Sequence, residues 1–343
     1  MADMYQNKDR TPYFKKDDSL EEALLDLNRL IGGIQPKNNY FSDKRPIILI
    51  IGCPRSGSTV MLQWLASLGL FSYPSNLIAR FYKNPYIGIR VQQSILEFDP
   101  LNQMGFHQTE INFKSSLGKT MGALSPSEFW YYWYEYFKFG ENTQKLSKSQ
   151  LKKVDGERFL KELYAFEYLT GKPLVMKGML LNWNIPYLYQ LNSNFLFINL
   201  TREPTLNAQS LLLAREKFFN NRNKWYSFKP QEYSTLKHED PITQVAGQVV
   251  YTQNAVDVGL SELPKKNVLH VQYEDFCSNP AVFLHNLIRK YNDLSGEGKL
   301  NCDTVSFTEN RFVANTEIRL SNADMHQLEK KIEFFRNKLA QES

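Results

Sequence analysis

An arginine and three hydroxyl side chains lie in a short loop between an apolar run and a helical pattern near the start of the chain. The run 47–51 contains only isoleucine and leucine, which is typical of a buried strand of a parallel sheet. Gly52 ends the strand, residues 54–59 form a tight polar loop, and apolar residues then recur at helical spacing as far as Gly69. The backbone N–H groups of such a loop, together with the positive end of the following helix dipole, bind anions. The sequence therefore predicts an anion site around Arg55.

The spacing within the loop narrows the choice of anion. A P-loop for nucleoside triphosphates, G-x-x-x-x-G-K-[ST], has a lysine directly after its second glycine. Gly52 and Gly57 have the required spacing, but Ser58 stands in place of the lysine, and the cation is Arg55 inside the loop. The alternative interpretation is an arginine-bearing turn that happens to follow a strand.

The motif P-R-S-G-S-T at residues 54–59 resembles the 5′-phosphosulfate loop of the sulfotransferase family. In that family this loop binds 3′-phosphoadenosine 5′-phosphosulfate (PAPS), with a basic side chain at the Arg55 position and hydroxyl groups at the next positions. The resemblance implies that the loop residues bind the donor; they are Arg55, Ser56, Gly57, Ser58 and Thr59.

A second arginine follows a later apolar run, residues 195–200. Pro204 suits the first position of the next helix, so Arg202 lies at the carboxyl end of a strand, where its guanidinium group can bind phosphate in a bidentate manner. Ser210 lies about two turns into that helix and can reach the same oxygens. Sulfotransferases carry an arginine and a serine at this eight-residue spacing, and the resemblance implies that the pair binds the 3′-phosphate. A structural arginine and a solvated serine are the alternative.

The resemblance also implies a lysine close to the transferred sulfonate, on the strand before Arg202. Lys177, near the end of the predicted strand 173–179, matches that placement. Cytosolic sulfotransferases carry a histidine base two residues later, but Met179 stands there, so the general base must come from elsewhere. Sulfuryl transfer resembles phosphoryl transfer, with in-line attack and charge on the equatorial oxygens. Arg55 and Lys177 would bracket the bridging oxygen and assist the leaving group.

Three side chains are candidates for the general base, namely Glu128, Glu110 and His107. Glu128 is the first choice because it lies within the most aromatic window of the chain, residues 124–139. The competing interpretation is a capping box, since Ser125 lies three residues earlier. Several aromatic side chains of the window can stack on sugar rings, although most are expected to pack as core: Trp130, Tyr131, Trp133, Tyr134 and Tyr136. Arg80 and Lys83 would meet an anionic acceptor, unless they only form a solvated helix face.

A third stretch, residues 268–291, resembles the family's late strand ending in Y-E-D, followed by a turn, a proline and a helix. Residues 273–275 are expected to be structural. Ser278 or Asn279 is expected to cap the helix, with Pro280 at its first position.

The chain is expected to fold as one α/β domain, residues 46–343, with a central parallel sheet flanked by helices on both faces. A helical insertion on the acceptor side is expected at about residues 70–170. Residues 1–45 would add an N-terminal tail and a covering helix. The first 18 residues are polar and expected to fray, and Ser19–Gly32 is an amphipathic helix with a capping-box spacing between Ser19 and Glu22.

Composition sets the limits on location and partners. The chain has 343 residues and a formal net charge of +5, which suits anionic ligands but is too diffuse to indicate nucleic acid. No apolar run approaches the ~18–20 residues that span a bilayer, and no signal peptide is recognised. Three cysteines lack a pairing pattern, and five scattered histidines form no metal motif. These features predict a soluble, cytoplasmic enzyme of bacterial type that needs no metal.

Together the motifs predict a sulfotransferase that moves the sulfuryl group of PAPS to a hydroxyl group, with a carbohydrate or glycolipid as the favoured acceptor. Small phenols, tyrosine residues and amines stay open as acceptors, and the oligomeric state is not predicted. A P-loop kinase or nucleotide hydrolase is one alternative, but it requires a lysine at position 58 and a magnesium-binding carboxylate where Thr201 and Arg202 stand. A non-catalytic nucleotide-binding protein of the same fold is the other.

Overall fold

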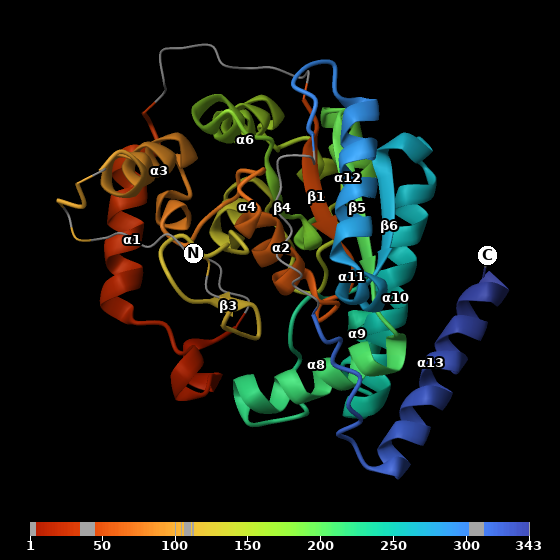
Figure 1. Cartoon of the computed structure of the whole chain (residues 1–343). Coiled ribbons are helices and arrows are strands. Elements are labelled where there is room, and N and C mark those ends of the chain that lie inside the picture. The colour runs from red at the N-terminus through yellow and green to blue at the C-terminus, as the bar shows by residue number, and fades with distance from the viewer. Residues whose placement is uncertain are drawn as a thin grey trace.

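A central sheet of four parallel strands organises the molecule (Figure 1). The structure is a computed structural model and describes residues 5–34, 45–99, 101–103, 105, 111, 113–301 and 312–342. The strand order is β4 (Val175–Lys177), β1 (Ile47–Ile51), β5 (Phe195–Thr201) and β6 (Val268–Gln272). All neighbouring pairs are parallel, so the strands that precede the sequence motifs end at one edge of the sheet. The predicted α/β architecture is confirmed.

Strand β1 lies between β4 and β5, and because the sheet is covered on both faces every one of its side chains is buried. Alternate residues of a strand point to opposite faces. Accordingly Leu49 joins one apolar core with α4 (Trp130–Tyr136), α6 (Gly156–Thr170) and α7 (Ile185–Leu191). Ile50 joins the other core, with α2 (Ser58–Ser67), α11 (Tyr273–Ser278) and α12 (Pro280–Leu294). Helices thus cover both faces of the sheet.

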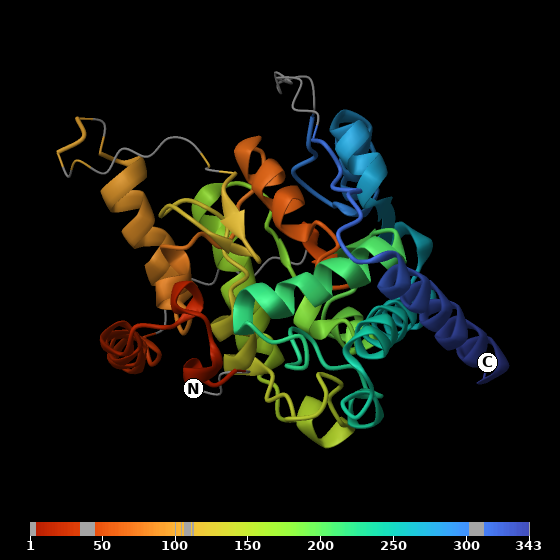
Figure 2. The same ribbon diagram turned by 90° about the horizontal axis from the view of Figure 1, so that it is seen from below.

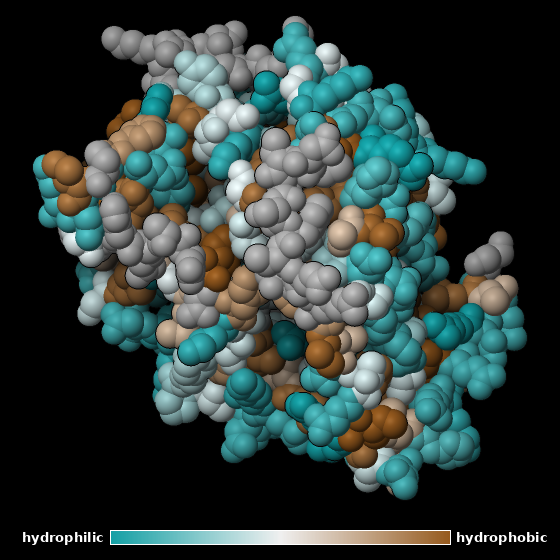
Figure 3. Space-filling model, in the orientation of Figure 1, coloured by the Kyte–Doolittle hydropathy of each residue, from teal (hydrophilic) through white to brown (hydrophobic). Residues whose placement is uncertain are grey.

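A third apolar cluster attaches the C-terminal helix. It joins α8 (Pro204–Phe219), α10 (Pro241–Ser261) and α13 (Asn322–Glu342), and its core includes Leu212, Val249 and Leu328. Figure 2 shows α13 running beside α10 at one end of the molecule. Hydrophilic residues cover most of the surface over α12 (Figure 3), as expected for a helix with one buried face.

The remaining elements are short connections and the helices of the acceptor side. They are η1 (Asn7–Asp9), η2 (Pro12–Phe14), α1 (Asp18–Ile31), η3 (Ile78–Phe81), α3 (Pro85–Gln92), the π-helical turn η4 (Gln93–Glu97), β2 (Ser115–Ser116), β3 (Lys119–Thr120), α5 (Lys148–Leu151), η5 (Met179–Leu181), α9 (Tyr233–Leu236) and η6 (Lys265–Asn267). None of the helices in the described part of the chain is long and apolar enough to cross a membrane.

The N-terminal segment differs from its prediction. The described residues from Tyr5 onward are packed rather than frayed: Phe14 is buried, and its ring centroid lies 4.8 Å from that of Phe218 on α8. Helix α1 lies beside α3, away from the sheet that it was expected to cover (Figures 1 and 2). The aromatic side chains of the segment bury apolar surface against α8, and the sequence pattern did not predict this contact.

Two predicted capping boxes are wrong. Helix α1 is capped by Asp17, whose carboxylate accepts a hydrogen bond from the Leu20 amide at 2.8 Å, not by Ser19. Helix α4 begins only at Trp130, after Phe129 with a φ of 55°, so Ser125 does not cap it. By contrast, the cap of α12 is confirmed, because Asn279 accepts from the Val282 amide at 3.2 Å and Pro280 follows it.

Glu162 on α6 gives the fold a pH dependence. Burial raises its pKa to about 7, although the nearby Arg158 guanidinium opposes the shift. The folded protein then binds more protons than the unfolded chain between the two pKa values, so this stability is present at low pH and is lost as the pH rises through about 7. The loss amounts to about 3 kcal/mol at high pH.

We therefore expect Glu162→Gln to make thermal stability less dependent on pH. Melting temperatures at about pH 5 and about pH 8 should differ less in the variant than in the native protein. Glu157→Gln is the matched control, because Glu157 lies exposed on the same helix. Equal pH dependence in the native protein and Glu162→Gln would show that the carboxyl group titrates normally.

Candidate active site

A cleft of about 1140 Å³ opens at the carboxyl ends of the strands. Residues that follow all four strands line it: Arg55 after β1, Met179 after β4, Arg202 after β5 and Tyr273 after β6. Ligand pockets commonly measure about 300–1,000 Å³, so this cleft has room for two molecules side by side. Parallel α/β sheets place ligands at this edge.

The polar loop at the floor of the cleft has the backbone of an anion site. Arg55 and Gly57 adopt left-handed conformations, with φ values of 68° and 95°, and α2 begins at Ser58 directly after them. The first amides of α2 have no carbonyl of their own helix to bond, and they carry the positive end of its dipole. Ser58 and Thr59 both line the cleft.

Two asparagines hold the loop in place, and the sequence motifs did not reveal either of them. The Asn182 side chain donates to the Gly52 carbonyl at 2.8 Å and accepts from the Gly52 amide at 3.2 Å. The Asn207 side chain donates to the Pro54 carbonyl at 2.7 Å. Both asparagines are buried, so the loop is fixed from behind before any ligand binds.

The structure brings Arg55, Arg202 and Ser210 together. The Nε of Arg55 donates to the Ser210 hydroxyl at 3.3 Å, and Arg202 donates from Nη1 to the Arg55 carbonyl at 3.0 Å. Arg202 also donates from Nη2 to the Asn315 carbonyl at 2.5 Å, so the segment before α13 reaches the site. The buried Nε of Arg202 has no hydrogen-bond partner, which leaves a donor for an anion.

Tyr273 is a site residue, beyond the structural role expected for residues 273–275. Its ring lies 5.1 Å below the Arg202 guanidinium group. A Cβ atom added at Gly57 would lie 2.2 Å from the ring, so the loop approaches the tyrosine as closely as only glycine allows. The Tyr273 ring thus supports both the loop and the second arginine.

Lys177 and Glu128 form an ion pair beside the loop. The Lys177 ammonium group donates to the Glu128 carboxylate at 2.7 Å and to the Thr59 hydroxyl at 2.7 Å. Lys177 is 5% exposed and Glu128 30%, so the carboxylate is the partner that faces the cleft. Lys177 itself does not line the cleft, so it acts on the cleft through Glu128 and Thr59, which do.

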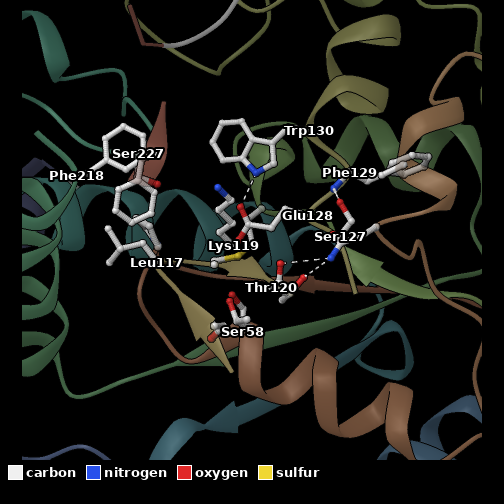
Figure 4. A pocket seen from close by; sticks show the side chains of 18 of the residues that line it. Ser58, Leu117, Lys119, Thr120, Ser127, Glu128, Phe129, Trp130, Phe218 and Ser227 are labelled. Carbon is white, nitrogen blue, oxygen red and sulfur yellow. Dashed lines mark hydrogen bonds between the residues drawn. The ribbon is translucent and has the colours of Figure 1, made fainter. Parts of the chain in front are cut away.

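Glu128 reaches the cleft because α4 starts after it. Its second carboxylate oxygen accepts from the Trp130 indole at 2.5 Å, and Figure 4 shows this bond with the carboxylate below the indole ring. Burial disfavours the charged form, but the Lys177 ammonium group and the hydrogen bonds from Lys177 and Trp130 outweigh it and lower the pKa of Glu128 below 4.5. The group is therefore a carboxylate at neutral pH and can accept a proton.

A half-buried tyrosine that the motifs missed also lines this part of the cleft. The Tyr226 hydroxyl donates to the Leu117 carbonyl at 3.2 Å, and burial raises its pKa to about 12. It is thus a neutral phenol at physiological pH. The turn between β2 and β3 passes close to Glu128, because a Cβ atom added at Gly118 would lie 2.6 Å from the Glu128 carboxylate.

The other predicted site residues are placed as follows. Ser56 is fully buried, does not line the cleft, and its hydroxyl group has no partner. Glu110 and His107, the alternative bases, lie outside the described residues. Of the five aromatic side chains considered for sugar stacking, Trp130, Tyr131 and Tyr134 line the cleft, whereas Trp133 and Tyr136 belong to the core.

The geometry defines what the site can do chemically. Fixed amides and two arginines gather at one end, where they suit phosphate or sulfonate groups. A lysine and a carboxylate lie next to this end, so a cation for developing charge adjoins a proton acceptor. Among the described residues no group of three or more histidine, cysteine, aspartate or glutamate side chains is arranged to hold a metal ion.

Comparison with known proteins gives one family. A model described as "Sulfotransferase family" matches residues 46–292. The fold resembles sulfotransferase STF1 from Mycobacterium tuberculosis H37Rv, with 13% identity, a TM-score of 0.50, and coverage of 89% of this chain and 81% of that one. Sulfotransferase STF9 from Mycobacterium avium has 14% identity and a TM-score of 0.49, with 82% and 73% covered. No curated protein sequence matches the chain.

Proposed function

This chain belongs to the sulfotransferase family, and from that membership we propose that it transfers the sulfuryl group of PAPS to a hydroxyl group of an acceptor. The observation that carries the proposal is the hydrogen-bonded row Thr59–Lys177–Glu128 beside a preformed anion loop. In this proposal Lys177 is the cation and Glu128 the base, at the point where donor and acceptor would meet.

The residues of the loop fit the phosphates of the donor. The free amides at the start of α2, with Ser58 and Thr59, would hold the 5′-phosphate. Arg202, with its unpartnered Nε, and Ser210 would hold the 3′-phosphate. Arg55 lies between them through its bond to Ser210 and would contribute charge to both groups. The part proposed for Ser56 is structural support or an amide contact, because its side chain is buried.

The reaction would use Lys177 and Glu128 in separate roles. The acceptor oxygen forms a bond to sulfur, the bond from sulfur to the phosphate oxygen breaks, and its electron pair stays on that oxygen. The Lys177 ammonium group, with Arg55, would stabilise the charge that develops there. Glu128 would take the proton of the acceptor hydroxyl group, which makes it our choice over Glu110 and His107.

We propose a carbohydrate or glycolipid as the acceptor. The support is the aromatic wall of the cleft, which includes Trp130, Tyr131 and Tyr134. Aromatic faces adjoining charged side chains suit the apolar faces and hydroxyl groups of sugar rings. The favoured compartment is the cytoplasm, a proposal supported by the free, buried thiols of Cys53 and Cys277, while Cys302 lies outside the described residues.

A P-loop kinase or hydrolase is less well supported by the site. Ser58 occupies the lysine position, and β5 is followed by Arg202 where a magnesium-binding carboxylate would be needed. A non-catalytic nucleotide-binding protein would have no use for a base bonded to a buried lysine at the cleft.

Calorimetric titration with 3′,5′-adenosine diphosphate tests the donor site. We expect metal-independent binding that weakens by about 10- to 100-fold in Arg202→Ala, because a charged hydrogen bond to phosphate contributes about 1.5–3 kcal/mol. Arg289→Ala, an exposed arginine on α12, is the control and should bind normally. A preference for ATP with magnesium, or no binding of either nucleotide, would refute the proposed function.

A further inference from the structure

We propose that the acceptor of this enzyme carries a negative charge besides its hydroxyl group, and that Lys15 and Arg80 bind that charge. The inference rests on the proposed function and narrows its acceptor to an anionic carbohydrate. It starts from the part of the cleft wall that the family model does not cover.

The N-terminal segment forms much of the acceptor side of the cleft. Its lining residues include Phe14, Lys15, Asp17 and Leu20, all before the first residue that the family model matches. The segment is held to the end of α8, because Thr11 donates from its amide to the Phe218 carbonyl at 2.9 Å and from its hydroxyl group to the Lys217 carbonyl at 3.0 Å. It is thus a fixed wall whose side chains can select a ligand.

This wall has more positive than negative charge. Five cationic side chains on the acceptor side line the cleft: Arg10, Lys15, Lys16, Arg80 and Lys119. Three carboxylates line it with them, namely Asp17, Glu21 and Glu128. Glu21 pairs with Lys16 at 2.9 Å, and Asp17 is used as the cap of α1. Glu128 pairs with Lys177 at 2.7 Å, so all three carboxylates are already engaged.

Two of these cations are already engaged with neutral groups. Arg10 is 8% exposed and donates to the Phe14 and Tyr5 carbonyls, both at 3.3 Å. Lys119 donates to the Tyr13 carbonyl at 3.2 Å and lies 4.9 Å from the centre of that ring. Both therefore add positive potential to the cleft without being free to move to a ligand.

Lys15 and Arg80 are different, because both are exposed and neither side chain has a hydrogen bond or ion pair to any described residue. Lys83, the other cation that the sequence assigned to this region, is paired with Glu135 at 3.6 Å and does not line the cleft. Lys15 follows directly after η2, and Arg80 lies in η3. Two separate elements thus each contribute one cation to the same cleft. Such a pair suits a carboxylate, sulfate or phosphate group.

The same wall restricts the rest of the ligand. Leu20, Leu77 and Tyr131 line the cleft beside these cations, so an acceptor with an apolar face or ring matches the surface better than a bare ion does. The phosphates of the donor have their own cations, Arg55 and Arg202, at the loop. An acidic saccharide satisfies both the cations and the aromatic surface.

The test compares two ligands that differ only at one carbon. Calorimetry is run on the complex with 3′,5′-adenosine diphosphate, using 4-nitrophenyl β-D-glucuronide and the uncharged 4-nitrophenyl β-D-glucoside. We expect the glucuronide to bind about five- to tenfold more tightly at low ionic strength, and this preference to disappear in Lys15→Ala/Arg80→Ala. Lys266→Ala, an exposed lysine outside the cleft, should keep the preference.

Each outcome has a distinct meaning. Equal affinities for the two glycosides, no binding of either, or a preference that survives in the double variant would overturn the inference. If the double variant instead loses affinity for 3′,5′-adenosine diphosphate by the same factor, the two cations serve the donor and the inference is also wrong. Failure of the diphosphate to bind the native protein would sink the proposed function itself.

Discussion

Glu128→Gln is expected to reduce kcat for sulfuryl transfer by about 10²- to 10⁴-fold, the usual contribution of a general base. Glutamine keeps the size of the side chain, but it cannot take a proton, and its single carbonyl oxygen can replace only one of the two carboxylate oxygens that accept from Lys177 and Trp130. Affinity for 3′,5′-adenosine diphosphate should therefore be nearly unchanged. The measurement is transfer from labelled PAPS to 4-nitrophenyl β-D-glucuronide, with binding followed separately by calorimetry.

The pH profile separates a base from a residue that only shapes the cleft. Burial raises the pKa of Glu128, but the Lys177 charge outweighs it and lowers the pKa below that of an ordinary glutamate, so the acid limb of kcat/KM should be shifted to low pH and be absent from Glu128→Gln. Lys177→Met removes the charge that lowers this pKa while burial persists. In that variant the acid limb should move to higher pH, in addition to a loss of about 10²- to 10³-fold in kcat.

These results would be contradicted by a Glu128→Gln enzyme that keeps native kcat. The base would then be one of the two residues outside the described structure, Glu110 or His107, and Glu128 would be a partner that orients Lys177. An unmoved acid limb in Lys177→Met would also count against the ion pair as the cause of the low pKa.

The sequence predicted the positions of those cleft residues that depend on local patterns. The loop at residues 54–59 lies between a strand and a helix, and Arg202 and Ser210 lie at fixed positions of the next such unit. Local spacing determines where such residues lie relative to a strand end. Strands β1 and β5 pair in parallel, so the loop that follows β1 and the arginine that follows β5 lie side by side.

Contacts between distant segments could not be predicted in this way. The bonds of Asn182 to Gly52 and the packing of Tyr273 against Gly57 join residues more than a hundred positions apart. No periodicity in the sequence marks them, because a buried asparagine and a core tyrosine fit any compact fold equally well. Glu128 shows a related limit: its spacing from Ser125 matched a capping box, but the helix starts two residues after it.

The N-terminal wall shows how packing can override a polar composition. Residues before α1 contain many charges, which favoured a frayed tail, but their few aromatic side chains decide the outcome. Tyr5 and Phe14 pack against Phe218, and the charged residues between them face the cleft or solvent. A few buried rings stabilise such a strap enough to order it, since each buries a large apolar area.

Gly57→Ala is expected to weaken binding of 3′,5′-adenosine diphosphate by about 100-fold or more. The new Cβ atom would lie 2.2 Å from the Tyr273 ring, and neither the ring nor the loop can move without cost, because Arg202 packs over the ring and asparagines hold the loop. Displacing the loop would break at least two charge-assisted hydrogen bonds between the loop and the phosphate, each contributing about 1.5–3 kcal/mol. Calorimetry measures the loss of affinity, and thermal unfolding measures any loss of stability.

Gly69→Ala, at the other end of α2, is the matched control. Gly69 also has a left-handed backbone, with a φ of 69°, but nothing lies within 4 Å of an added Cβ atom there. Both variants should lose about 1–2 kcal/mol of stability from backbone strain, since L-residues disfavour this conformation, and Gly57→Ala should lose more because of its contact with Tyr273. Only Gly57→Ala should lose the nucleotide. If both variants bound it normally, the contact between the loop and Tyr273 would not determine the shape of the anion site, and the fixed-loop mechanism would have to be abandoned.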